Sequence, residues 1–153
     1  MKILFLIFSS FIILSCTHDK ASQASPVPIT EIDKESLYGA GAEGIHQSNF
    51  VITNTTDWQN LMTQMNSTNN VTDNFAETNI DFNIYEIVAV FDEVRSNGGW
   101  TTEISSITET ATEISVAYHF SSGNGGFATC VITQPFHIVK IPKSSKPVNF
   151  YLN

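Results

Sequence analysis

The chain has 153 residues, of which 15 are acidic and seven are basic, and its formal net charge is −8. This length fits one ordinary domain. The few lysines and arginines form no basic run or stripe, which argues against nucleic acid, or an anionic membrane surface, as a partner bound through charge.

The N-terminus has the pattern of an export signal. Lys2 precedes an apolar run from Ile3 to Leu14, and Ser15 and Cys16 follow. As a helix the run is roughly 18 Å long, shorter than a bilayer core of about 30 Å. We therefore expect a cleaved segment rather than a membrane span.

The end of this run resembles the lipobox of bacterial lipoproteins, with aliphatic Ile13, small Ser15 and then Cys16. The resemblance implies a signal peptide over residues 1–15 and a membrane anchor on Cys16, because several acyl chains on one cysteine anchor stably. The alternative is an ordinary secretory peptide with an incidental cysteine. Thr17 stands where an inner-membrane retention signal usually has Asp, which favours outer-membrane delivery within a bacterial cell envelope.

The mature chain divides into a tether and one domain. Residues 16–30 are mostly small and polar, include two prolines and have no apolar period, so they predict a flexible lipidated tether. The domain is expected over residues 31–153, and its first residues form an acidic, solvated segment with Glu31, Asp33 and Glu35.

One helix is predicted near the start of the domain, after a short strand around Phe50–Ile52. Residues 57–65 follow several candidate N-cap residues and carry apolar side chains at i, i+3, i+4 and i+7, namely Trp58, Leu61, Met62 and Met65. This spacing is typical of one buried helix face. The polar stretch 66–74 predicts a loop.

The rest of the chain predicts β-strands over residues 84–91, 100–107, 113–120, 127–133, 136–141 and 148–152. The first of these is apolar on both faces, as in a central strand. Many short strands and one helix indicate a mainly β domain, an antiparallel β-sandwich or a barrel-like fold.

Residue types give little support for an enzyme. With Cys16 lipidated, Cys130 has no disulfide partner, and its apolar neighbours predict a buried thiol without catalytic work. His137 lies in an apolar stretch and is expected to be a hydrogen-bonded core histidine. The four histidines have no metal-ligand spacing, and Glu86 alone forms no acid–base pair. We expect no catalytic activity, metal or cofactor.

Three breaks between predicted strands each end in an aromatic residue. We take as candidate partner-binding residues Asn97, Gly98, Gly99 and Trp100; Gly123, Gly125, Gly126 and Phe127; and Gln134, Pro135 and Phe136. The alternative for each break is a turn whose aromatic ring covers the core. Loops on a rigid β scaffold commonly carry recognition, and the hypothesis is that these three share one binding edge with Trp100 as its main anchor.

The stretch from Asp81 to Phe150 resembles the PrcB C-terminal domain, found in a lipoprotein subunit of a bacterial surface protease complex. The similar pieces are Val88–Phe91, Arg95–Ile107 and Val131–Lys143. This resemblance implies a β-domain that is an accessory or assembly subunit and binds another envelope protein, in particular a protease. The family has no assigned catalytic residues.

A weaker similarity runs to chagasin-type cysteine-protease inhibitors, which present three loops of this kind in the same order. The Thr-Thr pair and the Arg of their loops are missing here. The alternatives of a protease inhibitor, or of a structural envelope lipoprotein without a protease partner, therefore stay open at this stage.

Overall fold

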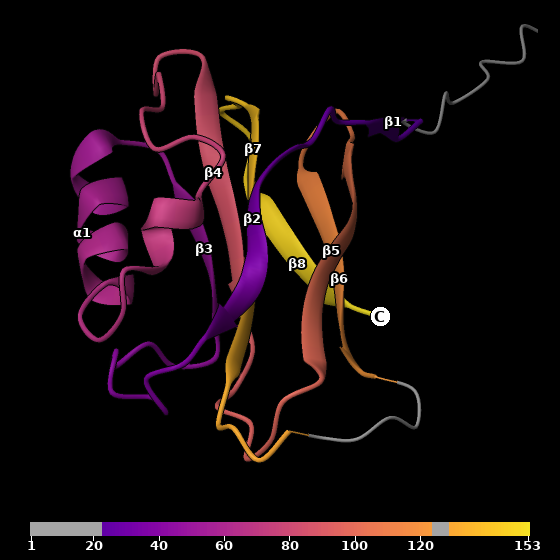
Figure 1. Cartoon of the computed structure of the whole chain (residues 1–153). Helices are drawn as coiled ribbons and strands as arrows, with labels where there is room; N and C mark the ends of the chain where they lie inside the picture. The colour runs from indigo at the N-terminus through magenta and orange to yellow at the C-terminus, as the bar shows by residue number, and fades with distance from the viewer. Residues whose placement is uncertain (1–22, 124–128) are drawn as a thin grey trace, which may run out of the picture.

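The protein folds into two β-sheets that face each other, with a helix on the outer side of one sheet (Figure 1). The structure is a computed structural model and describes residues 23–123 and 129–153. The expected mainly β sandwich with one short α-helix is confirmed. Residues 1–22, which include the expected signal peptide and Cys16, lie outside the described residues.

Each sheet has four strands, and the chain crosses between the sheets several times. One sheet has the order β1-β5-β6-β8 and the other β2-β7-β4-β3, and every neighbouring pair is antiparallel except β6 with β8. The strands are β1 (Ser25–Pro26), β2 (Thr30–Leu37), β3 (Ser48–Ile52), β4 (Tyr85–Phe91), β5 (Trp100–Glu109), β6 (Ile114–Ser122), β7 (Gln134–Pro142) and β8 (Val148–Leu152).

The central strands β4 and β7 separate two apolar clusters. Alternate side chains of β4 point to opposite faces of the sheet, because a strand repeats every two residues. Ile87, Ala89 and Phe91 pack toward the helix. Val88 and Val90 pack against the second sheet. Both clusters are buried, as the apolar run of this strand predicts.

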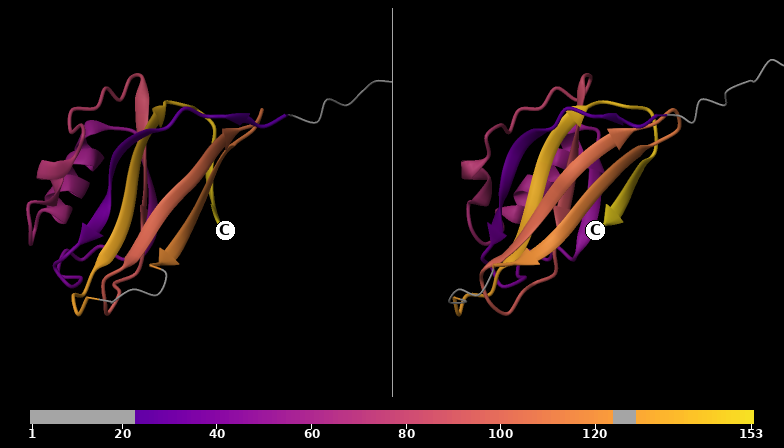
Figure 2. Two further views of the ribbon diagram at one scale, coloured as in Figure 1. Left: turned by 45° about the vertical axis from the view of Figure 1, so that its right-hand side comes forward. Right: turned by 90° about the vertical axis from the view of Figure 1, so that its right-hand side faces the viewer.

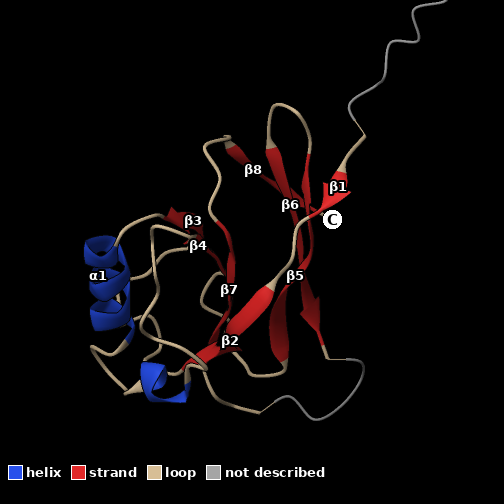
Figure 3. Ribbon diagram, turned by 90° about the horizontal axis from the view of Figure 1, so that it is seen from above, coloured by secondary structure: helices blue, strands red, loops and turns tan. Residues whose placement is uncertain are grey.

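The helix α1 (Thr55–Met65) covers the outer face of the β2-β7-β4-β3 sheet (Figure 3). It begins at Asn54, whose side-chain oxygen accepts the backbone N–H of Asp57. Trp58 is buried, stacks on Phe75 and donates its indole N–H to the carbonyl of Thr78. A 3₁₀ turn, η1 (Val71–Asn74), follows within the predicted loop. No helix of the described residues is long and apolar enough to span a membrane.

The folded domain begins earlier than the sequence predicts. Ser25 and Pro26, expected in the tether, pair with β5, and the N–H of Val27 donates to the carbonyl of Ile107. The acidic segment after residue 30 is strand β2 rather than a solvated lead-in. A register shift between Glu31 and Asp33 breaks the alternation of this strand, which hid it from a period-two pattern.

The predicted strand over residues 127–133 is not formed in its described part, residues 129–133. These residues contain only an isolated bridge between Thr133 and Arg95. Cys130 is exposed, so the expectation of a buried thiol is wrong. The apolar run that suggested burial belongs to a surface segment, in which Val131 and Ile132 are also exposed.

Candidate functional site at the loop end of the sandwich

The segment between β4 and β5 folds against residues 129–133 at one end of the sandwich, the lower end in Figure 1. Arg95 and Thr133 exchange two backbone hydrogen bonds, of 2.7 and 3.1 Å. The N–H of Gly98 donates to the carbonyl of Thr129 at 3.0 Å. The hydroxyl of Thr133 donates to the carbonyl of Asn97 at 3.2 Å. Two stretches far apart in sequence thus form one structured end, which we call the loop end.

The two glycines before Trp100 occupy positions where a side chain is disfavoured for different reasons. A Cβ atom on Gly98 would lie 2.2 Å from the hydroxyl oxygen of Thr129, so the Thr129 side chain would have to move to admit one. Gly99 has a φ of +90°, a conformation that L side chains rarely adopt. The Gly-Gly-aromatic pattern therefore shapes the turn and brings residues 97–99 against the second segment.

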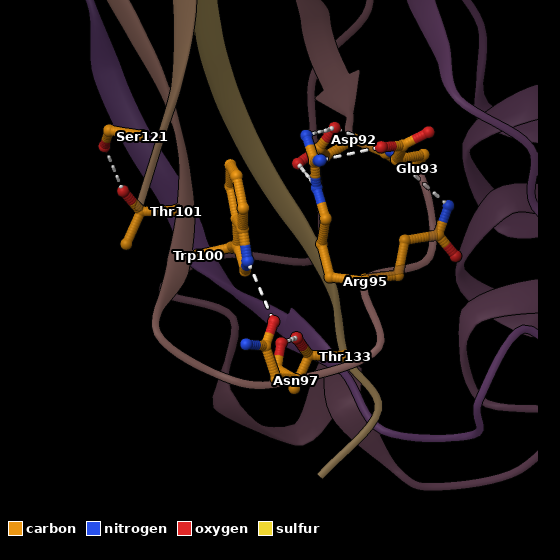
Figure 4. Close-up of polar contacts among 9 residues, drawn as sticks. Asp92, Glu93, Arg95, Asn97, Trp100, Thr101, Ser121 and Thr133 are labelled. Atoms are coloured by element: carbon orange, nitrogen blue, oxygen red, sulfur yellow. Dashed lines mark hydrogen bonds and ion pairs between the residues drawn. The ribbon is translucent and has the colours of Figure 1, made fainter. Parts of the chain in front are cut away.

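Arg95 connects a buried acid to the aromatic ring at this end (Figure 4). Its guanidinium donates to both carboxylate oxygens of Asp92, at 2.8 and 2.9 Å, and to Glu93 at 2.6 Å. It also lies over the ring of Trp100, 3.9 Å from the centroid. The indole N–H of Trp100 donates to the side-chain oxygen of Asn97 at 3.0 Å. Trp100 is therefore held in one orientation rather than free at a loop tip.

Gln134 fixes the loop end to the core. Its buried amide N–H groups donate to the carbonyls of Asp92 and Ile45, both at 2.9 Å. These bonds join the start of β7 to the end of β4 and to the loop before β3. The sequence predicted Gln134 at a binding edge, but its amide forms hydrogen bonds in the interior of the protein.

The third predicted loop does not form. Its residues Gln134, Pro135 and Phe136 are instead the first residues of β7. Phe136 is fully buried, with its ring 5.7 Å from that of Phe91 between centroids. The expectation that it forms part of a shared binding edge is wrong. Proline at the start of a strand is compatible with pairing, so it did not mark a break here.

The other predicted residues divide between the loop end and the part that is not described. Gly98 is buried, Asn97 and Trp100 are half-buried, and Gly99 is exposed. Gly123 joins this group, because its N–H donates to the carbonyl of Gly99 at 2.6 Å. Gly125, Gly126 and Phe127 lie outside the described residues.

A cleft of about 320 Å³ opens beside Trp100, between β2 and β5. Its lining is rich in hydroxyl groups and includes two aromatic rings: Lys34, Glu35, Ser36, Tyr38, Gly98, Gly99, Trp100, Thr101, Thr102, Thr129 and Thr133. Thr102 is 1% exposed, and its hydroxyl has no hydrogen-bond partner in the described structure. The β2 side of this cleft was not predicted from the sequence, because β2 was not expected to be a strand.

Apolar side chains surround the loop end on the outside. Four of them, between 41% and 55% exposed, lie on segments that meet there: Tyr38, Val94, Val131 and Ile132. We call these four residues the apolar rim. Sequence reasoning missed the rim, because Val131 and Ile132 read as core residues of a strand.

Burial also affects a titratable group away from the loop end. Glu86 is buried at the end of β4 remote from the loop end, and this burial raises the pKa of its carboxyl, against a hydrogen bond from the backbone of Ser144. Among the described residues, no three His, Cys, Asp or Glu side chains are grouped as a metal site.

Two sheets with a structured, partly apolar loop end define this protein as a β-sandwich domain with one candidate binding end. Residues 87–142, from β4 to the end of β7, match the model of the PrcB C-terminal family. The resemblance seen in the sequence is thereby confirmed over this stretch of the chain. No curated protein and no solved structure matches the chain.

Proposed function

We propose that this protein is a lipid-anchored, non-enzymatic subunit of the bacterial cell envelope that binds another protein, a protease, and assists its assembly. The match to the PrcB C-terminal family carries the proposal, since the family takes its name from a protease-complex subunit. Anchoring through Cys16 and outer-membrane placement are further parts of the proposal and rest on the sequence of the N-terminus.

The loop end supports a binding role. Its backbone is held by hydrogen bonds from three segments, so little conformational entropy remains to be lost on binding. The apolar rim lies around it, and exposed apolar groups of this kind often mark protein interfaces. Inhibition of the chagasin type is less well supported, because its third loop corresponds to residues buried in β7.

The proposal is tested by one matched pair of variants. Ile132→Asp places a charge in the apolar rim, and Ile84→Asp makes the same change at an exposed position near the other end of β4. The full-length chain is recovered from crosslinked envelopes, and the casein-hydrolysing activity that co-purifies with it is measured. We expect the wild type and Ile84→Asp to carry this activity and Ile132→Asp to lose most of it.

Absence of protease activity with the wild type, under crosslinking that captures known envelope complexes, would contradict the proposed partner. Equal recovery with both variants would contradict the assignment of the loop end as the binding surface. Thermal unfolding of each variant checks that it is folded, which is expected because both side chains are on the surface.

A further inference from the structure

We propose that the cleft beside Trp100 binds an extended segment of the partner polypeptide, which adds as a strand to the open edge of β5. This inference rests on the proposed protein-binding function and specifies how the partner is held. In both views of Figure 2, β7 lies between β2 and β5, and the cleft is lined near the loop end by residues of β2, of β5 and of the segment before β7.

The edge of β5 is covered over only part of its length. β1 pairs with Thr108 and Glu109, and Val27 reaches Ile107. The next residue, Pro28, has no N–H to donate, and the chain then leaves for the other sheet. Within the described residues, no strand is paired with the first half of β5 on this side, although β7 and β2 of the other sheet approach it.

The register of β5 shows which backbone groups face this open edge. The carbonyl of Gly99 accepts from Gly123, so Gly99 faces the β6 side. The N–H of Ile104 donates to Nδ1 of His137 at 2.8 Å, so Ile104 faces away from β6. Backbone groups alternate sides along an antiparallel strand. Trp100 and Thr102 therefore direct their N–H and C=O groups to the open edge, where the cleft lies.

The side chains of the cleft favour the same kind of ligand. Thr102 lines the cleft and has a buried hydroxyl without a partner, a costly arrangement that a polar ligand group would relieve. A volume of about 320 Å³ lies at the lower end of the range for ligand pockets, enough for a short segment. Strand addition supplies affinity through main-chain bonds and specificity through alternate side chains.

Charge specifies the segment further. Every Lys and Arg among the described residues already contacts an acidic side chain or a backbone carbonyl. In the cleft, Lys34 is paired with Glu103 at 3.1 Å, whereas Glu35 has no ion-pair partner within the described structure. A segment without acidic residues and with a Lys or Arg near Glu35 is therefore complementary.

The test uses random heptapeptides displayed on phage and selected on the full-length chain in detergent. Enriched peptides are synthesised, and each backbone amide is methylated in turn. Strand addition predicts that methylation weakens binding at alternate positions and is tolerated at those between. Hydrogen exchange read by NMR should show new protection at the amides of Trp100 and Thr102.

Two variants of the protein distinguish the effect of losing a hydroxyl in the cleft from the effect of placing valine in β5. Thr102→Val removes the unpartnered hydroxyl and should weaken peptide binding about three- to tenfold without lowering thermal stability. Thr108→Val is the matched control farther along β5, where β1 already covers the edge and the residue does not line the cleft, and it should leave peptide binding unchanged.

No enrichment, no alternation in the methylation series, or new protection confined to other residues would each overturn the inference. None of these results affects the proposed function, which is judged by co-purification of protease activity. If the Ile132→Asp test succeeds and the peptide test fails, the partner is bound by the apolar rim without strand addition.

Discussion

Trp100 and Phe136 lie at the same end of the domain but differ in burial and in the contacts of their rings. Phe136 is fully enclosed between Phe91 and Phe75 in the cluster below the helix. Trp100 is half-buried, under the guanidinium of Arg95, and lines the cleft. One ring therefore stabilises the core, and the other remains accessible for contact.

This difference predicts the stability of two variants. Phe136→Ala should lower the free energy of unfolding by about 3–5 kcal/mol, because it leaves a cavity in a packed cluster. Trp100→Ala should cost clearly less, because part of its surface is already in water and the turn is fixed by other bonds. Urea unfolding followed by circular dichroism measures both. Equal losses would show that Trp100 is a core residue as well.

At the scale of elements, His137 of β7 joins the two sheets. Its Nδ1 accepts the N–H of Ile104 in β5, so that nitrogen carries no proton, and its Nε2 lies 3.3 Å from Glu31 of β2. Burial lowers the pKa of the imidazole and outweighs the opposite effect of Glu31, while Lys34 adds to the lowering and Glu103 opposes it. The expectation of a hydrogen-bonded core histidine is confirmed.

This link predicts a loss of stability in mild acid. The folded state favours the neutral imidazole, so the contribution of His137 is complete above the unfolded pKa of about 6.5 and decreases as the pH falls below it. His137→Asn keeps an acceptor near the position of Nδ1 but does not titrate. Between about pH 7 and pH 5, the free energy of unfolding should fall more steeply for the wild type than for this variant. Parallel curves would contradict the assignment.

At the scale of the whole molecule, the position of β1 bears on how the domain is attached. Ser25 and Pro26 are part of a sheet, so the tether from the proposed anchor at Cys16 ends by residue 24, earlier than the sequence predicted. A chain of about eight residues spans at most roughly 29 Å. An anchor at Cys16 would therefore hold the domain closer to the membrane surface than a tether ending at residue 30 would.

The anchor itself is tested by Cys16→Ser. Loss of the thiol removes the only atom that can carry the proposed lipid at this position, so the variant should appear in the soluble fraction and take up no fatty-acid probe. Cys130→Ser is the control, because that exposed thiol lies in the domain and should not affect anchoring. Probe labelling that persists in Cys16→Ser would contradict the proposal.

Local patterns in the sequence were enough to predict the β-rich class, the helix near residues 57–65 and most of the strands from residue 84 onward. Each of these depends on side chains a few positions apart, such as the stripe from Trp58 to Met65 or the apolar run of β4. The importance of the glycines before Trp100 could also be predicted, because a positive φ or a close contact restricts which residue fits at a single position.

Only the tertiary structure decided which apolar residues are inside. Phe136 and Ile132 both stand in apolar stretches, but pairing of β7 with β2 and β4 buries the first, and the bridge at Thr133 leaves the second on the surface. Strand β2 and the cleft beside β5 were invisible in the sequence for a related reason. A bulge breaks the period of β2, and the cleft exists only where residues far apart in the chain come together, which no local pattern records.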